Sequence, residues 1–552
     1  MAKKTRFKSG FTLGGEQAEA DPLLVDAFFE SADYDVIRST SDPRCFVIGR
    51  TGAGKSAAFQ RIEEDAGDHV IRINPEDLSL PYITDLQVIR YLDSLDVNLD
   101  LFWIALWKHV LLVEIIRHRY SVNTPAAKQS FLQSLRERIS RDQGKEAALG
   151  YLDEFEGRFW CETEERVREI TDKFTKRIDA EGGASLPAGP VSISGKLAHG
   201  TEASNETRME QTEKFQRIVN STQLAKLNKM ISVLDEDILD DQHFTYVIID
   251  DLDRDWVDER LANDLIRCLF RTVLDLKRVA NLKVVVALRT NIFQELDFGR
   301  KSGGQEEKFR SLVLHMKWTP ADLEELLDER VRAAAPSRGI EATTVRDLLP
   351  HTNRTRGNPL NYILDRTLLR PRDAIAFLNE CLNVGIGKTR LSWQDIQSAE
   401  HTYSSKRLLA LRDEWKPTYP GIDQVAAKFR GASARMDKAE FQQRLDETML
   451  LLSDPDFPGV RWLTDLSAAM WSPGRDASWF SLYQPLTKLL YTIGLIGCSP
   501  QTSGAPVFYL TDPLFVDSET AIEKSNFFFI HRTYQAALDV RSGGRDPDNH
   551  GE

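Results

Sequence analysis

The sequence has little cysteine, no long uncharged apolar run and no excess of positive charge, and each lack narrows the class of protein. Its 5 cysteines among 552 residues are scattered, with no C-x-x-C pair and no histidine at metal-ligand spacing, which argues against a disulfide framework or a zinc site. We expect the cysteines to be reduced and mostly buried. The formal net charge of −13 argues against a surface that binds nucleic acid throughout, and leaves room only for a local basic patch.

The chain also lacks segments that would direct it to a membrane. Its first residues, MAKKTRFKSGF, are basic but are not followed by an apolar run, so they do not resemble a secretory signal. The most apolar window, residues 101–116, contains Lys108, His109 and Glu114 and is too short to span a bilayer, so we expect a core helix there. These features predict a cytoplasmic protein with no membrane partner.

Four short apolar runs predict a parallel β-sheet. They lie just before Gly49 and at residues 69–75, 246–249 and 283–288. The runs are rich in β-branched residues and do not alternate with polar ones, which is typical of strands that helices cover on both faces. The stretch between the second and third runs is far longer than a crossover helix needs, so we expect a mainly helical insertion there.

A glycine-rich motif follows the first run. Residues 49–56, GRTGAGKS, match the pattern G-x-x-x-x-G-K-S/T at every fixed position. The glycines let successive backbone N–H groups face an anion, and the N-terminus of the following helix adds a partial positive charge. We therefore expect a phosphate site in which Lys55 reaches the β- and γ-phosphates and the Ser56 hydroxyl holds Mg²⁺. The alternative is a glycine-rich turn that binds no ligand.

We call residues 49–56 the glycine loop. The residues that we expect to bind the nucleotide there are Gly49, Arg50, Thr51, Gly52, Ala53, Gly54, Lys55, Ser56 and the following Ala57.

Three aspartates lie within four positions directly after the third run, in the sequence YVIIDDLD. The carboxyl ends of parallel strands face one crevice, and we expect this strand to neighbour the strand before the glycine loop. Asp250 is then the expected metal ligand opposite Ser56. Asp251 stands where it could orient or deprotonate the attacking water. Asp253 is a second candidate for that role, or simply an acid at a helix start.

Two arginines in or near these strands are further candidates. The fourth run ends in LRTN, which places Arg289 at the same edge of the sheet, where a cation could detect the γ-phosphate. The alternative is a solvated strand end. Arg254 could reach the phosphate of a neighbouring subunit, although a structural salt bridge is the simpler interpretation.

Two more arginines, Arg370 and Arg372, flank Pro371 at a predicted helix start. Cations are disfavoured at a helix N-terminus by its dipole, so this pair suggests an anion nearby, with Arg372 the stronger candidate. The alternative is that Asp373 simply offsets their charge.

Capping and apolar patterns predict two more features of the C-terminal half. Thr319 is expected to cap a helix that begins at Pro320. Near the end of the chain, a leucine-rich helix stops at Gly494, and the sequences LIGC and PVFYL follow it as a predicted β-hairpin. A helix followed by a β-hairpin is the outline of a winged helix.

Together, the motifs GRTGAGKS, VIIDDLDR and RPRDAIAFLN resemble those of the KAP-type P-loop NTPases, in the wider STAND and AAA+ group. The resemblance implies a Walker A motif, a Walker B motif, a sensor 1 at LRTN and a sensor 2 at RPRD on a helical lid. It implies ATP and Mg²⁺ as cofactors. Many KAP members carry membrane helices between the two Walker motifs, whereas this insertion has none, and no appended effector motif is evident.

The resulting fold prediction is an α/β P-loop NTPase with helices on both faces of a parallel sheet. We predict a P-loop core at residues 1–75 and 240–318, a helical insertion with a Gly/Ser-rich loop at 76–239, a helical lid at 319–435 and a winged-helix-like domain at 436–552.

The predicted function is that of an ATP-binding and ATP-hydrolysing switch. It would act by lid closure or homo-oligomerisation on a protein partner, and the resemblance implies a role in bacterial antiviral defence. The catalytic residues would be Lys55, Asp251, Arg289 and Arg372. Two alternatives stay open: a protein that binds DNA or RNA and uses ATP as a structural ligand, and a P-loop phosphotransferase.

Overall fold

The chain folds into two compact units, each described here by itself. We call them the helical unit (Met1–Phe29, Thr51–Gly54 and Lys317–Glu552) and the sheet unit (Glu30–Arg50 and Lys55–Met316). The computed structural model describes residues 6–75, 97–120, 224–239, 244–252, 259–296, 306–471, 478–499 and 505–541, with the single residues 89, 92, 95, 133, 137, 213 and 216. Asp253, Arg254 and the predicted Gly/Ser-rich loop lie outside these residues.

The sheet unit is built on a five-stranded parallel sheet. The strand order is β2-β3-β4-β1-β5, and every pairing is parallel. The four predicted strands are confirmed, and a fifth of only three residues was not predicted. One expectation was wrong: β4 lies between β1 and β3, because the longest apolar strand pairs on both of its edges. The bounds are β1 Phe46–Ile48, β2 Val70–Ile73, β3 Thr245–Ile249, β4 Leu282–Leu288 and β5 Val313–His315.

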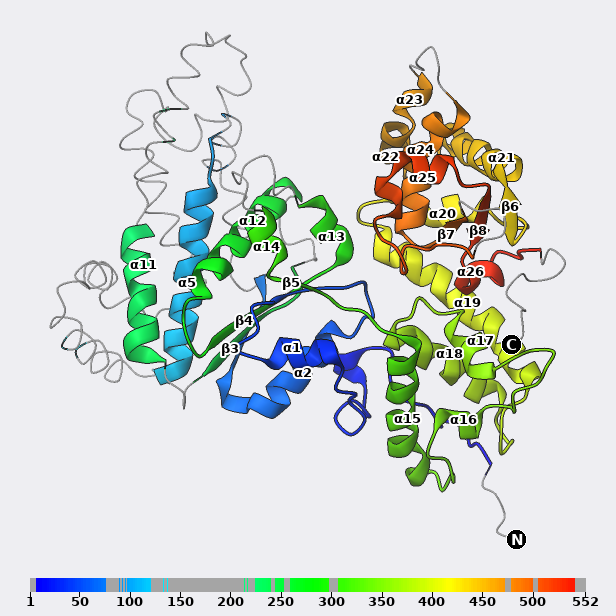
Figure 1. Cartoon of the computed structure of the whole chain (residues 1–552), viewed down its shortest axis with the longest axis horizontal. Coiled ribbons are helices and arrows are strands. Elements are labelled where there is room, and N and C mark those ends of the chain that lie inside the picture. Colours follow the sequence, from blue (N-terminus) through cyan, green and yellow to red (C-terminus); the bar gives the residue numbers. More distant parts are fainter. Residues whose placement is uncertain are drawn as a thin grey trace. The chain divides into compact units, whose positions relative to one another are not determined.

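Both faces of this sheet are buried. Val286 and Leu288 of β4 belong to the main apolar core, while Val285 and Ala287 point to the other face and are equally buried. Helices α1 and α2 cover one face and α5 and α12 the other (Figure 1). Apolar residues at consecutive positions therefore have two faces to fill, as the unalternating runs predicted. The helices of the sheet unit are α1 Ala32–Arg38, α2 Lys55–Ala66, α5 Asp100–Tyr120, α11 Leu224–Val233, α12 Glu259–Leu276, α13 Thr290–Glu295 and α14 Glu306–Arg310.

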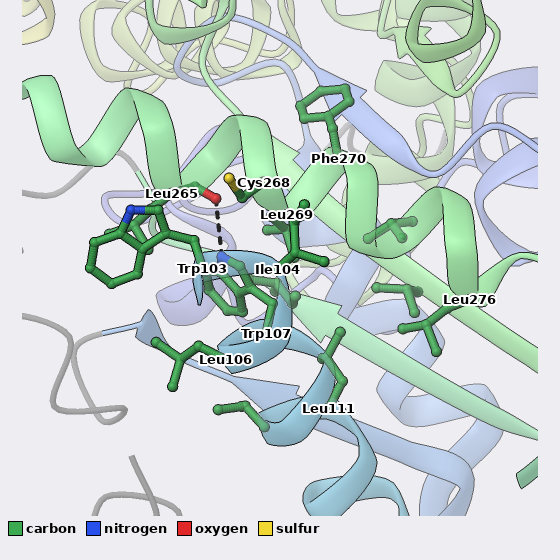
Figure 2. Packing of buried hydrophobic residues seen from close by; sticks show 14 of the residues in the cluster. Trp103, Ile104, Leu106, Trp107, Leu111, Leu265, Cys268, Leu269, Phe270 and Leu276 are labelled. Atoms are coloured by element: carbon green, nitrogen blue, oxygen red, sulfur yellow. Dashed lines mark hydrogen bonds between the residues drawn. The ribbon is translucent and has the colours of Figure 1, made fainter. Parts of the chain in front are cut away.

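The most apolar window of the sequence forms α5, which is a core helix as predicted. Figure 2 shows Trp103 and Trp107 of α5 beside Leu265 and Leu269 of α12, and the Trp107 indole N–H donates to the Leu265 carbonyl at 3.0 Å. The buried Lys108 ammonium is paired with Asp275 at 2.6 Å. No helix within the described residues combines the length and apolar character needed to cross a bilayer.

The helical unit begins with an N-terminal segment that packs on its helices. Phe7, Phe11 and Leu13 share one apolar core with α15 and α18. The predicted cap is confirmed, since the Thr319 hydroxyl accepts from the Asp322 N–H and α15 begins at Pro320. The helices are α15 Pro320–Ser337, α16 Val345–Leu348, α17 Pro359–Leu364, α18 Pro371–Val384, α19 Trp393–Trp415, α20 Ile422–Ala427, α21 Lys438–Met449, α22 Val460–Leu466, α23 Ala468–Trp471, α24 Trp479–Thr492, α25 Glu519–Glu523 and α26 Arg532–Gln535.

A small antiparallel sheet completes the helical unit, and its topology does not confirm a winged helix. The order is β6-β8-β7, with β6 at Arg435–Asp437, β7 at Ile496–Ser499 and β8 at Phe527–Ile530. The predicted hairpin partner contributes only a single bridge, between Cys498 and Val507. The unpredicted β8 pairs along the whole of β7, and its Phe528 and Ile530 are buried in the core of this region.

The cysteine prediction is confirmed for the described residues. Cys45, Cys268, Cys381 and Cys498 are free and buried, and Cys161 lies outside the described part of the chain. Burial raises the pKa of the Cys45 thiol to about 12.

Candidate functional site

The glycine loop joins β1 directly to α2. Gly52 and Gly54 have φ angles of +82° and +98°, in the left-handed region where a side chain is strained. A Cβ added to Gly52 would also lie 2.8 Å from the Cβ of Arg372. Because α2 begins at Lys55, the free N–H groups of its first turn follow the loop without a break. Ser56 and Ala57 are the next two residues of this turn.

The Lys55 side chain folds back over its own loop. Its ammonium donates to the Gly49 carbonyl at 2.7 Å and to the Arg50 carbonyl at 3.4 Å. The Thr51 hydroxyl is buried and has no hydrogen-bond partner within the described residues. A strong donor thus lies beside a polar loop whose conformation requires glycine.

Asp250 ends β3 as a buried acid. It is 7% exposed, accepts from the Asp251 N–H at 2.9 Å, and forms an ion pair of 3.3 Å with Arg72, which is itself partly exposed. Burial raises the pKa of Asp250, while the Asp251 N–H and the charges of Arg72 and Lys55 partly offset that rise. Asp251 adopts a φ of +59°, a left-handed conformation that aspartate tolerates better than most residues.

The connections of the sheet diverge at the edge after β1 and β4. The chain leaves β1 toward β2 on one side and leaves β4 toward β5 on the other. Ligands in open α/β sheets bind where the connections diverge in this way, at the carboxyl ends of the strands. The Gly49 N–H donates to the Leu288 carbonyl at 3.2 Å, so Arg289 adjoins the start of the glycine loop. Lys55, Asp250 and Arg289 therefore share one edge of the sheet unit.

The two arginines of α18 contact residues 51–54, which belong to the helical unit. The Arg370 guanidinium donates to the Thr51 carbonyl at 2.9 Å. The Arg372 N–H lies 3.5 Å from the Gly52 carbonyl, and its Nε donates to the Glu16 carbonyl at 2.8 Å. The Trp318 indole N–H donates to the Ala53 carbonyl at 2.8 Å.

The two arginines differ in their charge partners. Arg370 is buried and pairs with Asp373 at 2.9 Å and Glu414 at 3.3 Å. Although burial lowers it, the pKa of Arg370 is raised overall by these carboxylates. Arg372 has no carboxylate partner within the part of the chain that the structure describes, and burial together with the Arg370 charge lowers its pKa. Asp373 thus offsets the charge of Arg370, as one of our two interpretations expected, and Arg372 is the more available cation.

Some residues of this region carry no strong sequence signal. Arg72 was not predicted, although it is the one charged residue inside the apolar run VIRI and that position could have drawn attention. Trp318 and Glu16 contact the loop or the α18 arginines through long-range folding, and nothing in their local sequence indicates this.

The residue types at the sheet edge suit a polyphosphate with a divalent cation. Backbone N–H groups and an ammonium are donors for phosphate oxygens, and a hydroxyl and a carboxylate are oxygen ligands that Mg²⁺ prefers. Such a cation would also neutralise the buried charge of Asp250.

Comparisons with known proteins give two matches. A family model described as a FunZ-associated C-terminal helical domain matches residues 321–412, which contain α16, α17, α18 and parts of α15 and α19. A putative transposon gamma-delta 80.3 kDa protein of Escherichia coli (strain K12) is 21% identical over an alignment that covers 97% of this chain and 68% of that protein. The family match lies outside the glycine loop and Asp250.

Proposed function

We propose that the protein is a Mg²⁺-dependent ATPase of the P-loop type that works as a nucleotide-driven switch. The observation that carries this proposal is that the glycine loop with Lys55 follows β1 and Asp250 follows β3, so that both lie at the carboxyl ends of parallel strands in one sheet. A cation beside a buried, incompletely paired acid, next to a glycine loop at a helix start, suits phosphate and metal together.

Each residue has a role in this proposal. The N–H groups of the glycine loop and of the first turn of α2 hold the phosphates, and the Lys55 ammonium exchanges the Gly49 carbonyl for a phosphate oxygen. Ser56 and Asp250 would hold Mg²⁺, which supplies charge neutralisation at the transferring phosphate. Asp251 orients the attacking water, and Arg289 responds to the terminal phosphate.

A switch needs a ligand that acts on two parts of the molecule differently. The ends of the glycine loop belong to the sheet unit and its middle, Thr51–Gly54, to the helical unit. In this proposal the phosphates are that ligand, and the glycine loop is the segment that responds to them. Arg372, without a carboxylate partner in the described residues, is the α18 cation that we assign to the phosphates.

The KAP-type classification, homo-oligomerisation and a protein partner belong to the same proposal and rest on the resemblance of the motifs. A defence role against phage rests on that resemblance alone. The relative from the gamma-delta transposon supports an association with mobile genetic elements instead, so the biological setting is to be decided by identifying the partner.

The test is nucleotide binding by Lys55→Ala, with Lys229→Ala as a control that removes an exposed lysine of α11. The Lys55 variant should bind ATP at least about a hundredfold more weakly, because it loses a charge-assisted contact to two phosphates. The control should match the wild type in calorimetric titration. Unchanged ATP affinity in Lys55→Ala would reject the proposal.

Turnover separates the proposed ATPase from its two alternatives. Phosphate release without any added acceptor supports the ATPase. Transfer only to an added acceptor indicates a phosphotransferase, and tight binding without turnover indicates a structural nucleotide.

A further inference from the structure

Three arginines and one histidine of the helical unit form a group outside the glycine loop. We define the arginine cluster as His351, Arg354, Arg356 and Arg390. Residues 351–357 are all exposed, so the first three side chains belong to a solvent-facing loop between α16 and α17. The segment 343–358 contains a single acid, Asp347, in a chain whose net charge is −13. This local excess of positive charge contrasts with the negative net charge of the whole chain.

The loop is held rigid by its own hydrogen bonds. Asn353 and Gly357 form a backbone bridge, with the Gly357 N–H donating to the Asn353 carbonyl at 2.9 Å. The Asn353 side-chain oxygen accepts from the N–H of Arg356 at 2.7 Å and from that of Thr355 at 3.1 Å. Gly357 takes a φ of +71°, which glycine allows without strain. The arginines therefore project from a pre-formed turn, and ordering them for a ligand requires little loss of backbone freedom.

Two contacts anchor the loop on the segment before α19. Arg390 donates to one nitrogen of the His351 ring, and the Arg356 guanidinium lies 5.9 Å from the centre of the Trp393 ring. Both ends of the loop thus lie beside residues 390–393. These contacts bring the four members of the arginine cluster to one place on the surface.

No carboxylate within the described residues pairs with the arginines of the cluster. Arg390 donates to the backbone carbonyls of Arg346 and Asp347, which carry no charge, and to the His351 ring. Arg354 and Arg356 have no ion pair within the described residues. The Asp347 carboxylate is turned to the hydroxyls and N–H groups of Thr343 and Thr344. By contrast, Arg346 pairs with Glu324 and is left out of the cluster.

We propose that the arginine cluster binds the phosphate backbone of duplex DNA. Guanidinium groups match phosphate oxygens with two parallel hydrogen bonds, and a duplex presents one charge about every 1.7 Å of its axis, so a small rigid patch meets several phosphates. The aromatic ring of the patch, Trp393, is buried and offers no exposed face on which unpaired bases could stack. Contacts of this kind give affinity and orientation without reading sequence. This inference does not depend on nucleotide binding.

The test is fluorescence anisotropy of a short labelled DNA duplex with the full chain. The variant Arg354→Gln with Arg356→Gln should bind roughly tenfold more weakly, and the slope of log affinity against log salt should fall by about 1 for each arginine removed. The control, Arg332→Gln with Arg461→Gln, removes two exposed arginines of α15 and α22 in the same unit and should bind like the wild type. Arg354→Lys with Arg356→Lys should retain most of the salt slope.

Three results would overturn the proposal. They are no binding of the duplex by the wild type at low salt, an equal loss in the control pair, and tighter binding of a single strand or an RNA duplex of the same sequence. Arg356→Gln also removes the ring contact with Trp393. Arg354 is exposed and has no ion pair within the described residues, so Arg354→Gln alone should leave thermal unfolding unchanged, and its loss of binding reports on the contact with DNA.

Discussion

Two buried aspartates, one in each unit, show opposite electrostatic settings. Asp250 in the sheet unit is 7% exposed and Asp373 in the helical unit is 0% exposed. Burial raises the pKa of Asp250 because its partners are one partly exposed arginine and one backbone N–H. Burial acts on Asp373 in the same direction, yet the charges of Arg370 and Arg407 outweigh it and lower the pKa.

The difference lies in how completely each charge is paired. Asp373 is bound by Arg370 at 2.9 Å and Arg407 at 3.0 Å, and these arginines reach on to Glu414 and Glu16. All five of these residues belong to the helical unit. The charge of Asp250 is left incompletely compensated beside a loop suited to phosphate. The buried network of Asp373 stabilises the fold, whereas the few partners of Asp250 at the sheet edge are the reason for the magnesium site that we propose.

The largest expected effect comes from removing the charge of Asp373, which binds both Arg370 and Arg407. Asp373→Asn would leave two buried guanidinium groups without their shared carboxylate, and loss of one partner from a buried ion pair destabilises by about 3–5 kcal/mol. Urea unfolding followed by tryptophan fluorescence should show this loss. An unchanged unfolding midpoint would mean that the network is not what holds α18 and α19 together.

A smaller effect of opposite sign is expected for Asp250→Asn. The nucleotide-free protein should become more stable at neutral pH, because an incompletely compensated buried charge is replaced by a neutral group of the same shape. Thermal unfolding without nucleotide measures this, with the exposed Asp26→Asn as the control. Destabilisation by Asp250→Asn would remove the contrast with Asp373.

The pH dependence of these two variants should differ as well. Asp250 has a raised pKa, so the stability that its proton gives the fold is present in acid and is lost as the pH rises through that raised value. Asp373 has a lowered pKa, so its contribution is present above the usual aspartate value of 3.8 and is lost as the pH falls through the lowered value.

The gain in thermal stability from Asp250→Asn should therefore vanish in acid and grow toward neutral pH. The loss from Asp373→Asn should persist until the pH falls below the ordinary aspartate range. If the melting temperatures of the two variants changed with pH in the same way, the assigned pKa directions would be contradicted.

The smallest effect is expected at an exposed ion pair of the helical unit. Glu329 and Arg332 lie 2.7 Å apart with both side chains over 40% exposed. Glu329→Gln should change the free energy of unfolding by less than about 1 kcal/mol, as is usual for solvated pairs. A loss comparable to that of Asp373→Asn would show that burial is not what distinguishes the two networks.

Local patterns predicted much of the fold. The four apolar runs became the strands of a parallel sheet, and Thr319 and Pro371 opened helices where capping and proline position predicted. The order of the strands could not be predicted from local patterns. The pairing of β4 with both β1 and β3 depends on contacts between segments that are distant in the sequence. β8 was missed although its apolar run, Phe527–Ile530, directly follows Ser525 and Asn526, two residues that are common in turns.

The residues of the candidate site also fall into two groups, those that local sequence signals predict and those that depend on long-range contacts. Lys55, Ser56 and Asp250 could be named from a motif and a strand end, since both signals are local. The partners of these residues could not, because Arg72 comes from β2 and the contacts of Arg370 with Thr51 and Glu414 join positions far apart in sequence. The arginine cluster likewise depends on the folding of residues 390–393 against the loop 351–357.

The central claim is that Lys55 and Asp250 serve one magnesium nucleotide. Its most direct test is the calorimetric affinity for ATP, with and without Mg²⁺, in the wild type and in Asp250→Asn. The account predicts that Mg²⁺ strengthens ATP binding by the wild type by at least about tenfold, a difference of about 1.4 kcal/mol, and that the variant loses this gain. An equal gain from Mg²⁺ in the wild type and in Asp250→Asn would contradict it.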